Sequence, residues 1–152
     1  MLKLPVLHPE ILSSLGRAGH LSTVLISDGN YPHTTKPRPG VDVVWANYRP
    51  GLLDGNTVLE MLCDLIPIEA ATVMAPNLEG EFTMDHDPPI WVTYKKTLAG
   101  RADFHKDLVQ LQKPEFNALA EKPDLALVIA TGEQAIYANL LLTIGVITDE
   151  VG

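Results

Sequence analysis

Short apolar runs, separated by segments with helical spacing, constrain the fold of this chain most. The clearest run is LALVIA at 125–130, which is apolar throughout, as in a strand buried on both faces. We expect further strands at 22–28, 41–45, 70–74, 109–112 and 140–146. Helices are expected at 9–18, 57–65, 89–98 and 114–122. Strands that alternate with helices predict an α/β domain whose mixed or largely parallel sheet is covered on both faces.

Local signals mark the helix ends and one long loop. Pro9 suits the first turn of a helix, and Gly19 is expected to end that helix. Thr57 and Glu60 have the spacing of a capping box, which predicts that the second helix begins at Thr57. Residues 31–41 contain three prolines and a glycine and are expected to form a loop.

Length and composition indicate one globular domain, which we expect to span residues 1–152. A chain of this size can bury about 70% of the surface that its unfolded form exposes. The hydrophobic fraction of 46% and the charged fraction of 20% are ordinary for a folded protein. The net charge of -8 argues against nucleic acid as a partner, because phosphate recognition needs clustered Lys and Arg.

The predicted location is the cytoplasm, with no membrane as a partner. No apolar run reaches the ~20 residues that a membrane span needs, and the N-terminus lacks the long apolar stretch of a signal peptide. The one cysteine, Cys63, cannot form an internal disulfide, which agrees with a reducing compartment. Its apolar neighbours predict a packed core thiol and not a nucleophile.

Candidate chemical groups lie beside two predicted strands. In open α/β sheets ligands bind at the carboxyl ends of strands, where Asp28 ends the first strand and Thr131-Gly132-Glu133 follows the strongest one. His20 lies between the first helix and the first strand, and we expect it to meet Asp28 at the strand end. Such a pair can exchange protons near neutral pH. The residues alone leave open a simpler role for His20, as a cap or turn residue.

A tyrosine and an asparagine, Tyr137 and Asn139, interrupt the last two apolar runs. They either satisfy backbone groups in a turn or form a sugar-like site, in which the ring covers an apolar ligand face and the amide binds hydroxyls. His33 and His86 lack metal-ligand spacing, so no metal site is expected and both are read as solvated loop residues. Walker, dinucleotide-binding and nucleophile-elbow motifs do not occur in the sequence.

Several short motifs occur in a fixed order along nearly the whole chain, beginning with HPEIL at 8–12: Gly19-His20, Ser27-Asp28 followed by Tyr31-Pro32, Thr131-Gly132-Glu133, Tyr137-Ala138-Asn139 and Gly145-Val146. Together these motifs resemble the RbsD/FucU family, whose members include D-ribose pyranase and L-fucose mutarotase. The resemblance implies a three-layer α/β/α domain with a mixed sheet. It also implies a cytoplasmic isomerase, without cofactor or metal, that interconverts anomers or ring forms of a free monosaccharide.

The resemblance further implies a ring-like homo-oligomer, commonly a decamer, with sites near the subunit contacts. It places the family's histidine on His20, its aspartate on Asp28 and its aromatic-small-Asn triplet on Tyr137, Ala138 and Asn139. Opening a hemiacetal ring requires a proton on the ring oxygen and removal of one from the anomeric hydroxyl. His20 is therefore expected as general acid/base and Asp28 as its partner that binds a hydroxyl. The triplet is expected to bind the sugar.

The sequence departs from the family at the basic residue that opens the helix before the Thr-Gly-Glu strand. Lys113 fills this position only with a short insertion after it, whereas an ungapped match places Glu115 there. We take Lys113 as the substrate-binding candidate. A carboxylate instead of a cation would alter hydroxyl recognition and nearby pKa values, so the preferred sugar stays open.

Two other functions remain possible from the sequence. A non-catalytic sugar-binding or transport-associated protein of the same fold would keep the pocket and lack turnover. A different small-molecule isomerase or lyase would use His20 and Asp28 on a substrate that is not a sugar.

Overall fold

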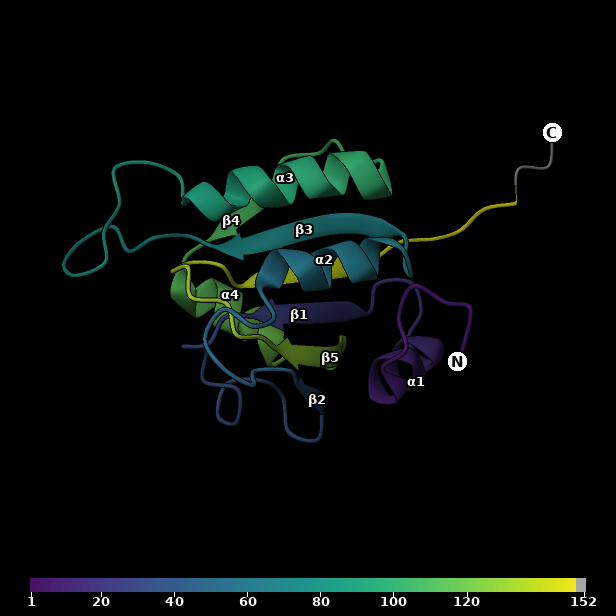
Figure 1. The fold of residues 1–152 in the computed structure, drawn as a ribbon. Coiled ribbons are helices and arrows are strands. Elements are labelled where there is room, and N and C mark those ends of the chain that lie inside the picture. Colours follow the sequence, from purple (N-terminus) through teal and green to yellow (C-terminus); the bar gives the residue numbers. More distant parts are fainter. Residues whose placement is uncertain (150–152) are drawn as a thin grey trace.

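The computed structural model describes residues 1–149, which form a six-stranded sheet with helices packed against it (Figure 1). Along the chain the elements are α1 (Pro9–Arg17), β1 (Thr23–Ser27), β2 (Asp42–Trp45), α2 (Gly55–Cys63), β3 (Ile68–Met74), α3 (Pro89–Ala102), β4 (Val109–Leu111), α4 (Lys113–Ala120), β5 (Leu125–Ala130) and β6 (Leu140–Ile144). All the predicted strands and helices are therefore confirmed, with small differences at their ends. No helix within residues 1–149 has the length and apolar character to span a membrane.

The sheet is mixed, with the strand order β2-β5-β1-β6-β3-β4. Strand β5 pairs in parallel with both β1 and β2, and β3 pairs in parallel with β4. Strand β6 lies between β1 and β3 and runs antiparallel to both. The prediction of a mixed, largely parallel sheet is confirmed. The carboxyl ends of the five other strands consequently lie at one edge of the sheet, beside the beginning of β6.

Helices cover both faces of this sheet, and the alternation of β1 divides the core in two. Val24 and Ile26 belong to the larger core, which α1, α2 and α3 cover. Leu25 points to the opposite face and belongs to a smaller core that includes Phe116 and Ala120 of α4. Because β1 is buried on both faces, it has to be apolar at successive positions, as its sequence is.

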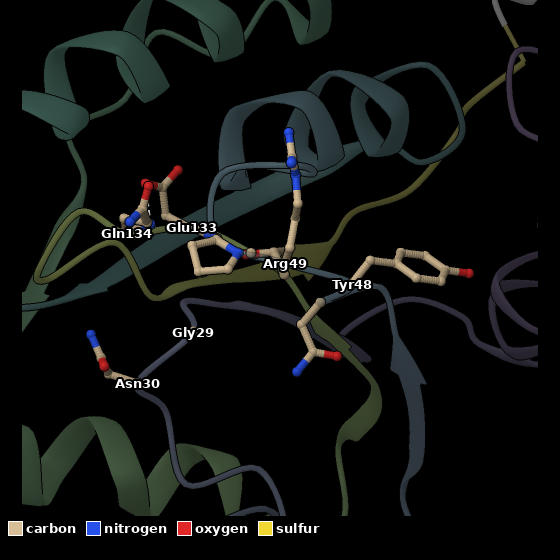
Figure 2. A pocket seen from close by; sticks show the side chains of 10 residues that line it. Gly29, Asn30, Tyr48, Arg49, Glu133 and Gln134 are labelled. Carbon is tan, nitrogen blue, oxygen red and sulfur yellow. Dashed lines mark hydrogen bonds between the residues drawn. The ribbon is translucent and has the colours of Figure 1, made fainter.

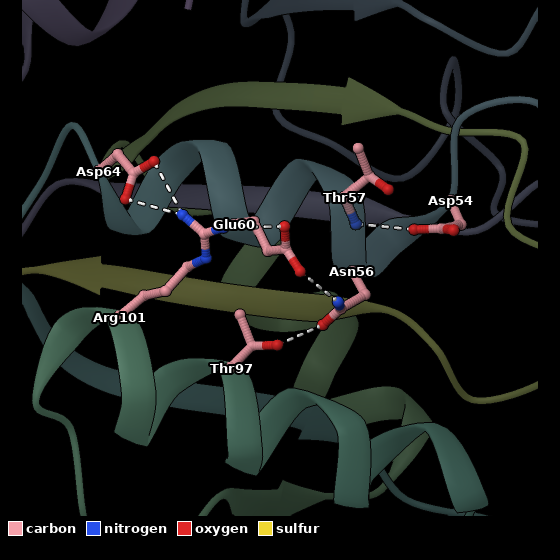
Figure 3. A network of polar contacts seen from close by, with 7 residues as sticks. All are labelled: Asp54, Asn56, Thr57, Glu60, Asp64, Thr97 and Arg101. Atoms are coloured by element: carbon pink, nitrogen blue, oxygen red, sulfur yellow. Dashed lines mark hydrogen bonds and ion pairs between the residues drawn. The ribbon is translucent and has the colours of Figure 1, made fainter. Parts of the chain in front are cut away.

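Polar contacts join α2 to α3, which lie side by side over the sheet (Figure 1, Figure 3). Arg101 of α3 binds Asp64, at the end of α2, at 3.1 Å and Glu60 at 3.3 Å. Thr97 donates a hydrogen bond of 2.8 Å to the Asn56 side chain. These exposed or half-buried pairs each contribute little stability, and the buried apolar residues of both helices pack in one core.

The predicted capping box at Thr57 is wrong. Asp54 is the N-cap of α2, and its carboxylate accepts a 2.7 Å hydrogen bond from the Thr57 backbone N–H. Thr57 is thus the third residue of the helix, which begins at Gly55. The Glu60 side chain binds the side chains of Asn56 and Arg101, and not the Thr57 backbone N–H that a capping box requires.

Cys63 lies in the larger core, as predicted. Burial raises the pKa of its thiol to about 11. The thiol therefore stays protonated at neutral pH, which suits a packing role and not nucleophilic catalysis.

Candidate active site

A cavity of about 450 Å³ opens at the carboxyl ends of β1 and β3, beside the first turns of α4. Asp28, Tyr137, Asn139 and Lys113 all line it, so four of the six predicted site residues share one cavity. Ala138 lies between two of them and is itself buried. The position agrees with the general rule that ligands bind at the carboxyl ends of strands in open α/β sheets.

Asp28 is buried in this cavity and is held by Asn139. The Asn139 amide donates a 2.9 Å hydrogen bond to the Asp28 carboxylate and accepts a 3.0 Å bond from the Asp28 backbone N–H. The other carboxylate oxygen accepts a bond of 2.9 Å from the Asn30 backbone N–H. Burial nevertheless raises the pKa of Asp28, because desolvation outweighs these hydrogen bonds. Asn139 therefore orients the carboxylate.

Two aromatic residues of α3 fix the backbone of the 137–139 triplet. The Trp91 indole N–H donates to the Tyr137 carbonyl at 2.9 Å, and the Tyr94 hydroxyl donates to the Ala138 carbonyl at 2.8 Å. Both aromatic rings are completely or almost completely buried. Tyr137 itself adopts a left-handed backbone conformation with φ of 59°, which is uncommon outside glycine and is maintained here by these contacts.

The Tyr137 hydroxyl is already occupied within the protein. It donates a 2.6 Å bond to the Phe82 carbonyl and accepts a 3.1 Å bond from the Asn77 backbone N–H. These bonds tie the 75–88 loop, which extends from the end of β3, to the cavity (Figure 1). What Tyr137 presents to a ligand is consequently its ring, in line with the predicted cover over an apolar ligand face.

Lys113 is the first residue of α4, and it is the positively charged residue of this helix that lines the cavity. Glu115 is exposed and is not among the residues that line the cavity. Within residues 1–149, no carboxylate forms an ion pair with Lys113. The geometry thus agrees with Lys113 as the candidate at the basic position.

The prediction that His20 meets Asp28 is wrong for a single chain. His20 precedes β1 and Asp28 follows it, so the two lie at opposite ends of a strand whose five residues span about 16 Å at about 3.3 Å each. His20 is half-exposed, and its Nε2 contacts the Glu69 carboxylate at 2.6 Å. The sequence already places His20 before the predicted strand and Asp28 at its end, so the prediction failed because it overlooked the length of an extended strand.

The Thr131-Gly132-Glu133 turn is structural. The Thr131 hydroxyl donates to the Ser27 carbonyl at 2.8 Å. The Glu133 carboxylate accepts bonds of 2.8 Å from the two backbone N–H groups that follow it and a 3.1 Å bond from Gly55 at the start of α2. A Cβ on Gly132 would lie 2.5 Å from a backbone carbonyl oxygen. The motif therefore joins β5 to α2, and its carboxylate accepts three hydrogen bonds from backbone N–H groups.

A second cavity, of about 400 Å³, lies beside this turn (Figure 2). Its lining includes Asn30, Tyr48, Arg49 and Gln134. In Figure 2 the side chains of Tyr48 and Arg49 point in different directions and do not converge with Asn30. Because these three side chains do not converge, this cavity is a weaker candidate for a binding site.

Several residues of the first cavity were not predicted, including Asn77 and Phe82 of the loop after β3 and Asn117 of α4. No local pattern marks the loop residues, because the tertiary contact with Tyr137 brings them there. Asn117 could have been found, since it lies three residues before the buried Ala120 and thus on the buried side of α4. Within residues 1–149, no group of three or more His, Cys, Asp or Glu side chains is placed to hold a metal ion.

Comparison with known proteins gives consistent matches. Residues 1–147 match the model of the RbsD / FucU transport protein family. Fucose mutarotase from Mus musculus is 31% identical over 144 residues, which cover 92% of this chain and 90% of the relative. Fucose mutarotase from Homo sapiens is 29% identical over 146 residues, with coverages of 93% and 90%.

Solved structures share the fold. The fucose mutarotase from Streptococcus pneumoniae, solved in complex with L-fucose, has a TM-score of 0.79 and 23% identity, covering 97% of this chain and 100% of the other. Bacillus subtilis RbsD complexed with D-ribose has a TM-score of 0.74 and 24% identity, with the same coverages. The three-layer arrangement expected from the sequence is therefore the fold of these proteins as well.

Proposed function

The chain belongs to the RbsD/FucU family, and from this premise we propose that it is an isomerase that interconverts anomers or ring forms of a free monosaccharide. One observation carries the proposal: a cavity at the strand ends gathers a buried carboxylate, an aromatic ring and a cation, from Asp28, Tyr137 and Lys113. Relatives with about 30% identity over nearly the whole chain are fucose mutarotases.

The chemistry needs only proton transfer. Ring opening protonates the ring oxygen and removes the proton of the anomeric hydroxyl, and closure reverses both steps. Asp28, whose pKa burial raises, exchanges protons closer to neutral pH than an exposed carboxyl does and binds a sugar hydroxyl. The Tyr137 ring stacks on the apolar face of the sugar, and Lys113 donates to a hydroxyl oxygen.

His20 enters the proposed site from a second copy of the chain. It lies at the opposite end of β1 from Asp28, it is half-exposed, and Glu69 holds its ring. His20 is a general acid/base candidate at the surface, and within residues 1–149 no histidine lines the cavity that contains Asp28. This arrangement suits a homo-oligomer whose sites lie between subunits. The family resemblance implies that this homo-oligomer is a decamer. The proposal includes a cytoplasmic location. It is supported by the single cysteine, which cannot form an internal disulfide and so agrees with a reducing compartment.

A second candidate function is a sugar-binding protein without catalysis. The separation of His20 from the cavity within one chain favours it, because a protein that never brought the two together would keep the cavity and lack turnover. Both candidates bind a monosaccharide, and only the isomerase accelerates anomer exchange.

The test is saturation-transfer NMR of anomer exchange on L-fucose and D-ribose, with wild type, His20→Ala and Asp28→Ala. The isomerase accelerates exchange of at least one sugar, and both variants lose most of this acceleration. If wild type binds sugar and leaves the exchange rate unchanged, the binding protein is the correct reading. If wild type binds neither sugar, both sugar functions are excluded for these substrates.

A further inference from the structure

Two residues that line the cavity containing Asp28 each have a buried polar atom without a hydrogen-bond partner. The Tyr31 hydroxyl and the Asn117 side-chain oxygen are both inaccessible, and neither has a partner in the described part of the chain. Tyr31 is 5% exposed and Asn117 is 9% exposed, and both residues line the cavity that contains Asp28. Buried polar groups are nearly always paired, so two unpaired ones at one cavity require an explanation.

The surroundings of the two residues do not require polar atoms for folding. Tyr31 packs in the smaller core with Leu25, Met74 and Phe116, where a phenylalanine ring would make the same apolar contacts. Asn117 lies on α4 next to Phe116. Unpaired polar atoms are costly in such a setting, and proteins accept this cost chiefly at functional sites.

We infer that Tyr31 and Asn117 are specificity-determining residues, which bind a hydroxyl group of the sugar at the α4 side of the cavity. The inference rests on the proposed function. An amide oxygen only accepts hydrogen bonds, whereas a phenol can donate one. A sugar hydroxyl can do both, so one hydroxyl satisfies either atom or bridges the pair. A methyl or methylene group at that point leaves them unpaired.

The ionisation state of Tyr31 agrees with a donor role. Burial raises the pKa of Tyr31 to about 12, and the negative charges of Glu121 and Asp28 act in the same direction. The phenol therefore keeps its proton at neutral pH. The substrate class is then a monosaccharide that presents a hydroxyl to α4, in preference to its deoxy analogue.

Tyr31→Phe gives the sharpest test, because a functional and a structural hydroxyl predict opposite results. Without sugar, the variant should be as stable as wild type or melt about 2–4 °C higher, since an unpaired buried hydroxyl is removed. Its Kd for the sugar should rise about 3- to 10-fold, as expected for one neutral hydrogen bond. The KM should rise more than kcat falls, because the pair contacts no reacting atom.

Asn117→Leu removes the amide at similar size, and it should also raise the Kd. Only Tyr31→Phe is used to compare stability. Asn117→Leu would change the stability of α4 for a second reason, because leucine favours a helix more than asparagine does. Tyr48→Phe is the matched control, since the Tyr48 side chain is highly exposed and lies outside this cavity. It should change neither the melting temperature nor the Kd.

Pairs of sugars that differ by one hydroxyl complete the experiment, namely L-galactose with L-fucose and D-ribose with 2-deoxy-D-ribose. Wild type should prefer the hydroxylated member of at least one pair, and Tyr31→Phe should lose that preference. A Tyr31→Phe variant that binds every sugar as tightly as wild type, or that melts lower without sugar, overturns the inference while the isomerase proposal stands. A wild type that neither binds nor exchanges any sugar overturns both.

Discussion

Removal of the Tyr94 hydroxyl is the simplest test of how α3 supports the cavity that contains Asp28. Tyr94 is fully buried, and its hydroxyl donates a 2.8 Å hydrogen bond to the Ala138 carbonyl. Tyr94→Phe keeps the ring and leaves that carbonyl without its donor. An unsatisfied buried acceptor costs about 1–3 kcal/mol. For a chain of this length each kcal/mol lowers Tm by about 2–4 °C, so a fall of about 2–12 °C is expected.

The assay is thermal unfolding of Tyr94→Phe and wild type at the same chain concentration, because assembly would make Tm depend on concentration. Tyr48→Phe removes the same atom at an exposed position and should leave Tm unchanged. The kcat/KM for anomer exchange should also fall in Tyr94→Phe, since Ala138 lies between Tyr137 and Asn139 at the cavity. A variant as stable and as active as wild type would refute the claim that α3 holds this triplet.

Three further substitutions test other contacts. Asn139→Leu removes a donor to the Asp28 carboxylate, so the pKa of Asp28 should rise further above its ordinary 3.8. The loss of unfolding free energy in this variant should therefore be smallest in acid and grow as the pH rises through the pKa of Asp28. Urea unfolding at acid and neutral pH measures this difference. Gly132→Ala places a Cβ 2.5 Å from a backbone oxygen and should cost about 1–3 kcal/mol in thermal unfolding. Glu69→Ala releases the His20 ring and should lower kcat for exchange about 10- to 100-fold with little change in KM.

Each of these has a result that contradicts it. An Asn139→Leu penalty that is the same at all pH values would mean that the amide does not support the ionised carboxylate. For Gly132→Ala the control is Gly16→Ala in α1, where a Cβ meets no atom within 4 Å, and equal effects of the two would exclude the close approach. Glu69→Gln keeps a hydrogen-bond acceptor and should recover part of the rate, so an equal loss in both variants would argue against positioning of His20.

The sequence predicts the fold well because the elements have strong local signals. Leu125–Ala130 is apolar throughout, and the strand β5 has these bounds in the structure. The start of α2 was missed, because Asp54 and Thr57 both suit an N-cap and only the fold decides between them. Where local chemistry allows two answers, tertiary contacts select one.

The site is predictable only in part, for geometric reasons. Asp28, Asn139 and Lys113 follow or precede regular elements at one edge of the sheet, so strand direction brings them together. His20 is near Asp28 in the sequence but is separated from it by the length of β1. Residues that are near in the sequence lie far apart in space when an extended strand separates them. A site that contains both His20 and Asp28 therefore needs two chains.

Complementation between two inactive variants tests the shared site most directly. His20→Ala and Asp28→Ala are co-expressed with different tags, mixed assemblies are purified, and anomer exchange is measured by saturation-transfer NMR. If each site takes His20 from one copy and Asp28 from another, random mixing makes about a quarter of the sites intact, and about a quarter of the wild-type rate returns. If mixed assemblies stay as inactive as the separate variants, His20 and Asp28 do not form one site across two chains.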